Sequence, residues 1–75
     1  MQVEVRLFAY LRQLCGGNLQ KLELSEGISV QDLIEKLNLT DEKSLIIMVN
    51  GRREEMTKLL KDGDRVGIFP PVGGG

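Results

Sequence analysis

Hydrophobic and polar residues alternate with a period of two in three short segments of the chain. Residues 2–8 carry valine or leucine at every second position with polar or charged residues between them, and residues 21–24 repeat the pattern. Residues 65–69 alternate in the same way and place Phe69 on the face opposite Val66 and Ile68. A period of two is typical of a strand with one buried side. These segments are therefore predicted to be strands.

A helical period replaces this alternation in the middle of the chain. Apolar residues recur there at the i, i+3, i+4 and i+7 spacing of an amphipathic helix, at Val30, Leu33, Ile34 and Leu37. Ser29 precedes them and Asp32 follows three residues later, which is the spacing of a capping box. The pattern predicts the main helix of the protein over residues 29–38.

The remaining elements are shorter. A helix of about two turns is expected over residues 9–15, where Leu11, Leu14 and Cys15 share one face. Residues 45–49 form a continuous apolar run, which predicts a strand covered on both sides. The pair Asn50-Gly51 that follows suits the positive φ angles of a tight hairpin turn.

This order of elements predicts an α+β domain, with a mixed sheet of four to five strands and one main helix packed across it. The arrangement is compatible with a ubiquitin-like β-grasp. The predicted domain covers residues 1–71, and residues 72–75 are expected to form a flexible C-terminal glycine tail.

Composition excludes several kinds of chemistry. The 75 residues contain no histidine and a single cysteine, Cys15, so we expect no catalytic imidazole, no internal disulfide and no metal site. Ten basic and eleven acidic residues give a net charge of −1, which argues against a nucleic-acid partner. No signal peptide and no apolar run of about 20 residues is present, so we expect a cytoplasmic protein without a membrane partner.

The C-terminal sequence is the feature with the clearest functional content. Three glycines, Gly73, Gly74 and Gly75, follow Pro70-Pro71 and Val72, although glycine contributes neither a side chain to the core nor backbone stiffness. One interpretation is a frayed end or a linker remnant. The other is that a second protein grips the last residues as bare backbone, with the prolines directing the segment outward.

Several segments together resemble one protein family. The sequence from Phe69 to Gly75, preceded by Asp62-Gly63-Asp64, closely resembles the C-terminal end of the small subunit of molybdopterin synthase. Leu7-Phe8-Ala9 is similar to that family's first strand, and Val49-Asn50-Gly51 to its central hairpin. The resemblance covers nearly the whole chain and implies a β-grasp fold.

The resemblance also implies a function, which is sulfur carriage for the synthesis of molybdopterin or of the related tungsten cofactor. A ubiquitin-activating-type enzyme would use ATP and Mg²⁺ to adenylate Gly75, and a persulfide donor would then supply sulfur to form a thiocarboxylate. The glycines Gly73 and Gly74 would thread the tail into the large subunit of the synthase, where the sulfur is used. The carrier would bind no cofactor itself and would have no catalytic activity outside the complex.

The resemblance and the pattern also single out contact residues. Phe69, Pro70, Pro71 and Val72 are candidates for partner binding, and for Phe69 a place in the core is the alternative. Arg12 occupies a family position that is linked to partner contact, and its alternative is a solvated helix charge. Cys15 is expected to be a buried small hydrophobe, since it shares an apolar face with leucines.

Three other functions remain open at this stage. The chain could carry sulfur for thiamine or tRNA thiolation, could be a ubiquitin-like protein modifier, or could be an interaction module with an inert tail. The molybdopterin branch ranks first because the Phe-Pro-Pro stretch at residues 69–71 resembles it more closely than it resembles the thiamine branch.

Overall fold

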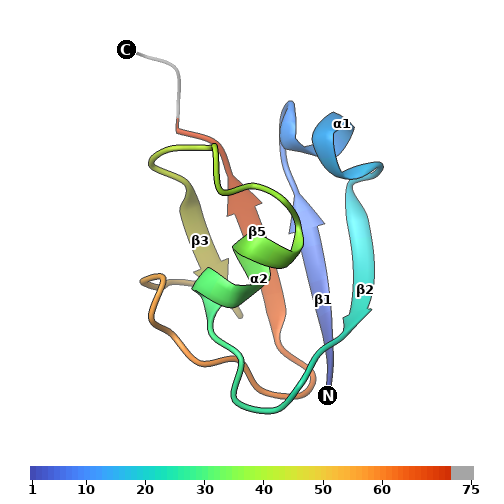
Figure 1. Ribbon diagram of the computed structural model, residues 1–75, viewed down its shortest axis with the longest axis vertical. Helices are drawn as coiled ribbons and strands as arrows, with labels where there is room; N and C mark the ends of the chain where they lie inside the picture. The colour runs from blue at the N-terminus through green and yellow to red at the C-terminus, as the bar shows by residue number, and fades with distance from the viewer. Residues whose placement is uncertain (72–75) are drawn as a thin grey trace.

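The computed structural model describes residues 1–71, and Figure 1 shows how seven elements are arranged. In chain order they are β1 (Gln2–Leu7), α1 (Leu11–Cys15), β2 (Leu19–Glu23), α2 (Val30–Lys36), β3 (Ile46–Val49), β4 (Arg52–Arg53) and β5 (Arg65–Phe69). This order and the five strands confirm the predicted α+β architecture with one main helix.

The sheet has the strand order β2-β1-β5-β3-β4, so the first and last strands lie side by side at its centre. Strand β1 runs parallel to β5, with Val5 opposite Val66, and antiparallel to β2. Strand β3 pairs antiparallel with β5 and with the two-residue strand β4. The sheet is therefore mixed, and its central pair joins segments about 60 residues apart in the sequence.

Helix α2 begins where the sequence predicts. The Oγ of Ser29 accepts a hydrogen bond from the backbone N–H of Asp32 at 3.2 Å, and the Asp32 carboxylate accepts one from the Ser29 N–H at 2.9 Å. This reciprocal capping box satisfies two N–H groups at the start of the helix. The helix ends at Lys36, two residues before the predicted limit.

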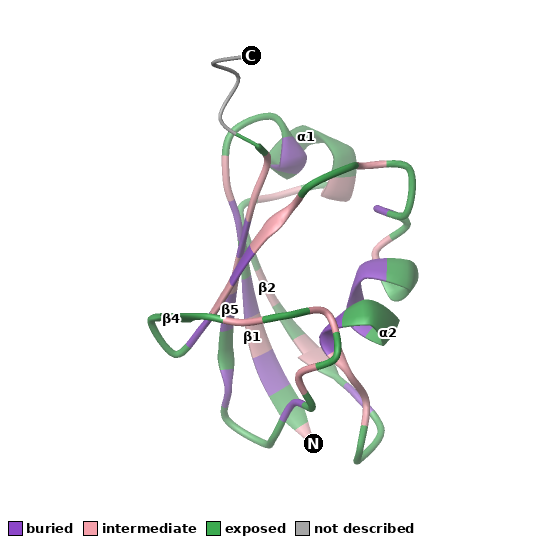
Figure 2. Ribbon diagram, turned by 90° about the vertical axis from the view of Figure 1, so that its left-hand side faces the viewer, coloured by how far each residue is buried: buried purple, intermediate pink, exposed green. Residues whose placement is uncertain are grey.

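One face of the sheet and helix α2 enclose the core. Seen at 90° to the first view, α2 stands on one side of the sheet, and within residues 1–71 no helix lies on the other (Figure 2). The core comprises the buried apolar residues Val3, Val5, Leu7, Leu11, Leu24, Val30, Leu33, Ile34, Leu39, Ile47, Val49, Leu60, Val66 and Ile68. The uncovered side is called the open face below, and Ile46, Met48 and Phe69 lie on it.

Hydrogen bonds connect the turn after β3 to the turn at residues 61–64, which precedes β5. Asn50 and Gly51 both have positive φ, at 52° and 84°, which confirms the tight turn between β3 and β4. The Asn50 side chain donates to the buried carboxylate of Asp64 at 2.9 Å, and the same carboxylate accepts from the Lys61 N–H at 2.8 Å. These bonds fix the start of β5 against the end of β3.

One expectation about burial is wrong, and the predicted apolar face of the first helix is only partly buried. The strand within residues 45–49 is not covered on both sides, because Ile46 and Met48 are only half-buried on the open face while Ile47 and Val49 enter the core. Leu14 is 57% exposed, although Leu11 on the same predicted helical face is fully buried. Helix α1 has only five residues, and it contacts the end of β1 through a strip too narrow to bury both leucines.

Candidate functional site

The open face of the sheet ends in an aromatic pair next to the C-terminal segment. The alternation in β5 sends Val66 and Ile68 into the core and leaves Phe69 on the open face. Phe8 follows directly after β1, where its N–H donates to the Ile68 carbonyl at 3.2 Å. The two rings stack with centroids 4.1 Å apart and an angle of 9° between their planes. Both are half-buried, so the pair presents apolar surface to solvent rather than to the core.

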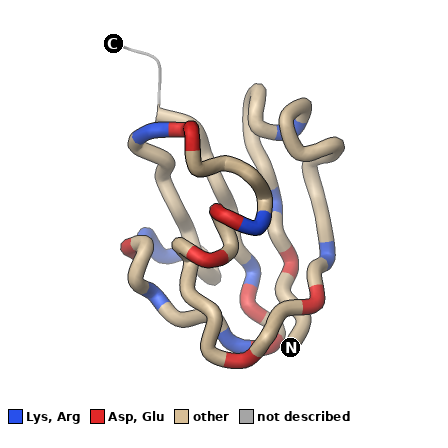
Figure 3. The backbone as a smooth tube through the Cα atoms, viewed as in Figure 1, with Lys and Arg blue, Asp and Glu red and all other residues tan. Residues whose placement is uncertain are grey.

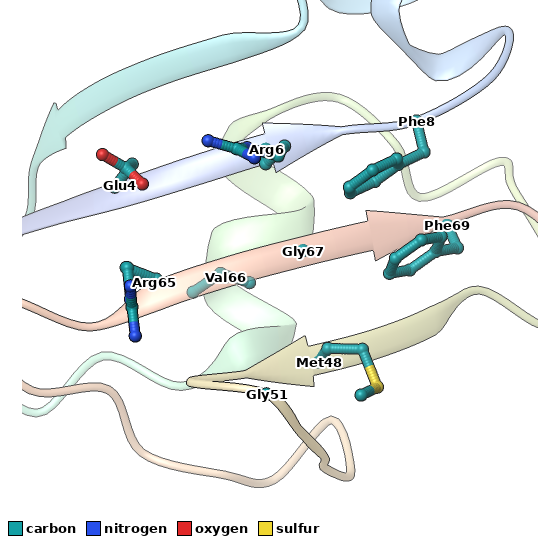
Figure 4. Close-up of a pocket in the computed structure, with 9 residues that line it drawn as sticks. All are labelled: Glu4, Arg6, Phe8, Met48, Gly51, Arg65, Val66, Gly67 and Phe69. Atoms are coloured by element: carbon teal, nitrogen blue, oxygen red, sulfur yellow. The ribbon is translucent and has the colours of Figure 1, made fainter.

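Gly67 makes room for this pair. A Cβ at this position would come within 3.3 Å of the Phe69 ring and 3.5 Å of the Phe8 ring. The glycine thereby opens a groove of about 370 Å³ between the rings and the charged part of the face (Figure 4). Arg6 and Met48 lie on opposite sides of it, on β1 and β3.

A second groove, of about 510 Å³, lies on the other side of the rings where the C-terminal segment leaves the sheet. Its lining is almost entirely apolar and consists of Phe8, Ala9, Tyr10, Ile46, Phe69, Pro70 and Pro71. An exposed apolar groove of this kind is typical of a protein-binding surface. The structure therefore brings three predicted contact residues, Phe69, Pro70 and Pro71, into one surface.

Arg12 lies beside this surface, on a third groove of about 490 Å³ that it shares with Phe8 and Ala9. Its side chain is exposed, and its Nε donates to the Ala9 carbonyl at 3.1 Å. Ala9 has a φ of 55°, in the left-handed region where non-glycine residues are strained. The bond holds the guanidinium at the edge of the groove, in a position from which it can contact a partner.

Tyr10 joins the surface to the loop before β3. Its hydroxyl donates to the Glu42 carboxylate at 2.8 Å, and this hydrogen bond raises the pKa of Tyr10. Nothing in the sequence pattern indicates Phe8, Tyr10 or Ile46 as contact residues. Phe69 alternates with Val66 and Ile68 along its strand, which indicates that its ring lies on the other face of the sheet. No local pattern indicates that Phe8 is its stacking partner.

Cys15 is not arranged as a reactive thiol. It is half-buried against the core, its Sγ lies 3.9 Å from the Leu37 carbonyl oxygen, and burial raises the pKa of the thiol. Reactive cysteines have the opposite shift, because the thiolate is the nucleophile. The sequence predicts a buried Cys15; the side chain packs against the core but is only partly buried.

The described part of the chain contains no metal centre and no membrane span. Among residues 1–71, no three histidine, cysteine or acidic side chains are grouped so that they could hold a metal ion. Within the same residues, neither helix has the length and apolar character needed to cross a bilayer. The tail residues Val72, Gly73, Gly74 and Gly75 lie outside the described part, so their predicted roles rest on the sequence.

Comparison with known proteins gives matches over almost the whole chain. The model of the ThiS family matches residues 5–75. A molybdopterin synthase sulfur carrier subunit from Chlamydomonas reinhardtii is 34% identical over 83 aligned positions, which cover 100% of both chains. The aligned region extends over the whole of this chain and therefore includes positions 73–75.

Solved structures agree with these matches. A Pyrococcus furiosus structure assigned as molybdopterin converting factor, subunit 1, has a TM-score of 0.80 and 40% identity, covering 96% of this chain and 99% of that one. Small archaeal modifier protein 1 from Methanosarcina acetivorans has a TM-score of 0.75 and 34% identity, with coverage of 99% and 96%. A chain in the complex of subunits 1 and 2 of molybdopterin-converting factor from Helicobacter pylori has a TM-score of 0.68 and 26% identity, with full coverage of both.

Proposed function

The chain belongs to the ThiS family, and we propose that it is a sulfur carrier, the small subunit of a molybdopterin synthase. The observation that carries the proposal is the full-length match to a molybdopterin synthase sulfur carrier subunit. The ubiquitin-like β-grasp fold that the chain shares with the Pyrococcus furiosus structure supports it.

The proposed reaction site is the carboxylate of Gly75. A free carboxylate is a poor acyl donor, because its charge repels nucleophiles and oxide is a very poor leaving group. An adenylating enzyme of the ubiquitin-activating type would therefore use ATP and Mg²⁺ to attach AMP to one carboxylate oxygen. The persulfide of a donor protein then attacks the acyl carbon, and AMP leaves with that oxygen, which gives an acyl disulfide. A second thiol reduces this disulfide by forming a new disulfide with the donor, and the outer sulfur atom stays on the carrier. The product is a thiocarboxylate on Gly75.

The residues before Gly75 would present it to the partner. Gly73 and Gly74 have no Cβ, so a segment of bare backbone can enter a channel too narrow for any side chain. Pro70 and Pro71 restrict the backbone before the glycines, which reduces the conformational entropy lost on docking. Val72 would be the last side chain available for contact.

The open face would bind the partner while the tail is held. The grooves on either side of the Phe8–Phe69 pair lie next to the exit of the C-terminal segment, and Arg12 stands at their edge. In the Helicobacter pylori complex, the similar chain is present with subunit 2 of the converting factor. We assign the corresponding large subunit as the partner of this surface.

The carrier would contribute no catalytic side chain of its own. The sequence contains no histidine, and burial raises the pKa of its one thiol, so the chain offers neither an imidazole base nor a reactive thiolate. Catalysis is assigned to the adenylating enzyme and to the large subunit. Because adenylation of Gly75 consumes ATP, we propose that the carrier acts in the cytoplasm.

The test is an intact mass spectrum of the purified chain after incubation with ATP, Mg²⁺, a persulfide donor, a thiol reductant and the adenylating enzyme of the same organism. We expect one oxygen to be replaced by one sulfur in the wild-type chain and no change in a chain that lacks Gly75. Subsequent addition of the large subunit and its pterin precursor should return the carboxylate. An unmodified chain, with an adenylating enzyme that is active on another carrier, would refute the proposal.

A second function has a specific observation in its favour, which is the 34% identity to small archaeal modifier protein 1 from Methanosarcina acetivorans. A modifier would form an isopeptide bond between Gly75 and lysines of other proteins. Conjugates of higher mass that disappear on deletion of Gly75 would reveal this activity. A sulfur carrier for thiamine or tRNA thiolation would be distinguished by the large partner that purifies with the chain.

A further inference from the structure

Cross-strand register arranges the open face in rows. The row at the C-terminal end is apolar and comprises Phe8, Phe69 and Ile46. The second row crosses all five strands and comprises Leu19, Arg6, Gly67, Met48 and Arg53. The third row comprises Lys21, Glu4 and Arg65. An apolar row is therefore followed by two rows that are rich in charge.

These two rows are strongly basic. They contain four cationic side chains and one carboxylate, although the whole chain has a net charge of −1. Arg6, Arg53 and Arg65 are exposed. Within residues 1–71 the ion pairs are those of Glu23 with the N-terminal amine and of Glu54 with Lys58, so no carboxylate lies within 4.0 Å of these guanidinium groups.

The opposite side of the molecule has a different charge. Helix α2, which covers the other face of the sheet, carries Asp32 and Glu35 against one basic residue, Lys36 (Figure 3). Positive charge is thus concentrated on the same side of the sheet as the aromatic pair. A field of this kind attracts a partner of opposite charge and orients it before contact.

We propose that the surface of the large subunit that covers the Phe8–Phe69 pair also presents carboxylates to Arg6 and Arg53. This inference rests on the proposed function and adds the chemistry of the partner's surface. The acidic groups steer the carrier onto its partner and fix the register in which the tail is delivered.

The dimensions of the face support one continuous footprint. At about 3.3 Å per residue, Arg65 lies roughly 13 Å from Phe69 along β5. Arg6 and Arg53 are three strands apart, which is roughly 14 Å at the usual strand spacing. An interface of standard size buries about 800 Å² on each partner and extends over such distances. A partner of this size that binds the aromatic pair therefore also reaches the arginines. It must either form ion pairs with them or leave them hydrated at the rim of the interface.

The test is the rate of association with the large subunit of the same organism, followed by stopped-flow fluorescence. The variant Arg6→Glu/Arg53→Glu reverses the second row, and neither residue faces a carboxylate directly across the strands. The matched control is Lys36→Glu/Arg52→Glu, which makes the same change in net charge away from the open face. Lys36 lies on α2, and Arg52 pairs with the buried Val49. Thermal melting checks that both variants are folded.

We expect the open-face variant to associate at least about tenfold more slowly than wild type at an ionic strength of about 0.01 M. The control should change the rate much less. Between about 0.01 and 0.15 M the Debye length falls from about 30 to about 8 Å, so the wild-type rate should fall with salt while that of the open-face variant should not.

Three results would overturn the inference alone, and a fourth would overturn it together with the proposed function. Equal rates for wild type and the open-face variant would show that no acidic surface faces the second row. An equal loss in the control would show a nonspecific effect of net charge. A wild-type dimer that the open-face variant does not form would show that the second row binds α2 of another copy instead of the large subunit. A wild-type chain that fails to bind the large subunit at all refutes the proposed function first, and the inference with it.

Discussion

Truncation of Phe69 to alanine separates a docking role for this ring from a structural one. In a closed core, a Phe→Ala change costs about 3–5 kcal/mol, because the transfer energy is lost and a cavity remains. Phe69 is half-buried on a face that no second layer covers, and water can fill the space that its ring leaves. Its main contact on that face is the stack on Phe8 at 4.1 Å. We expect a loss of about 1–2 kcal/mol in the free energy of unfolding.

That loss corresponds to a melting temperature about 5–15 °C lower in a domain of this size. The loss of binding free energy to the large subunit should exceed the loss of folding stability. Aromatic anchors near the centre of an interface typically contribute 2 kcal/mol or more on truncation, which is about a 30-fold increase in Kd. Urea unfolding gives the first quantity, and titration calorimetry with the large subunit gives the second.

Two control variants frame the result. Ile68→Ala removes a fully buried side chain from the same strand and should cost about 2–5 kcal/mol of stability. Leu59→Ala removes an apolar side chain that is 57% exposed and lines neither groove beside the rings, so it should change neither quantity appreciably. The reasoning fails if Phe69→Ala is as destabilising as Ile68→Ala, or if the folded variant binds with unchanged Kd.

Three further predictions concern other parts of the chain. Asp64→Ala removes a buried acceptor and leaves the Asn50 amide with one bond fewer, so the urea midpoint should fall by the equivalent of about 1–3 kcal/mol at an unchanged m value. Hydrogen bonds from Ser29 lower the pKa of Asp32, so its contribution to stability is present above the ordinary carboxyl pKa of about 4 and is lost as pH falls toward the lower folded value. Melting temperatures measured at decreasing pH should therefore decline less in Asp32→Asn than in wild type, and equal declines would contradict this. Gly74→Ala should abolish most thiocarboxylate formation in the mass-spectrometric assay and leave the melting temperature unchanged, because a Cβ obstructs a narrow channel without touching the core; normal sulfur transfer in this variant would show that no such channel exists.

Local interactions explain why several elements could be predicted from sequence. The capping box of Ser29 and Asp32 and the turn at Asn50-Gly51 depend on residues at most three positions apart. The alternation around Ile68 fixes which side of β5 enters the core, since successive side chains in a strand point to opposite faces. The sequence also limits reactivity, because it lacks histidine and has one cysteine.

Burial and proximity required the tertiary structure. The apolar run at residues 45–49 contains no sign that only one face of its strand is covered, because that depends on the single helix that packs against the sheet. Leu14 matches the helical pattern, yet it is exposed because α1 is too short to present a wide face to the core.

The candidate site shows the same division. The family resemblance, the glycine tail and the position of Phe69 on the strand face opposite Val66 and Ile68 can be read from short segments of the sequence. The exposure of Phe69, its stacking on Phe8 and the row that Arg6 shares with Arg53 follow from the folded sheet. These neighbours lie on strands far apart in the sequence, and the register of a sheet is set by the packing of its buried face rather than by the residues on its open face.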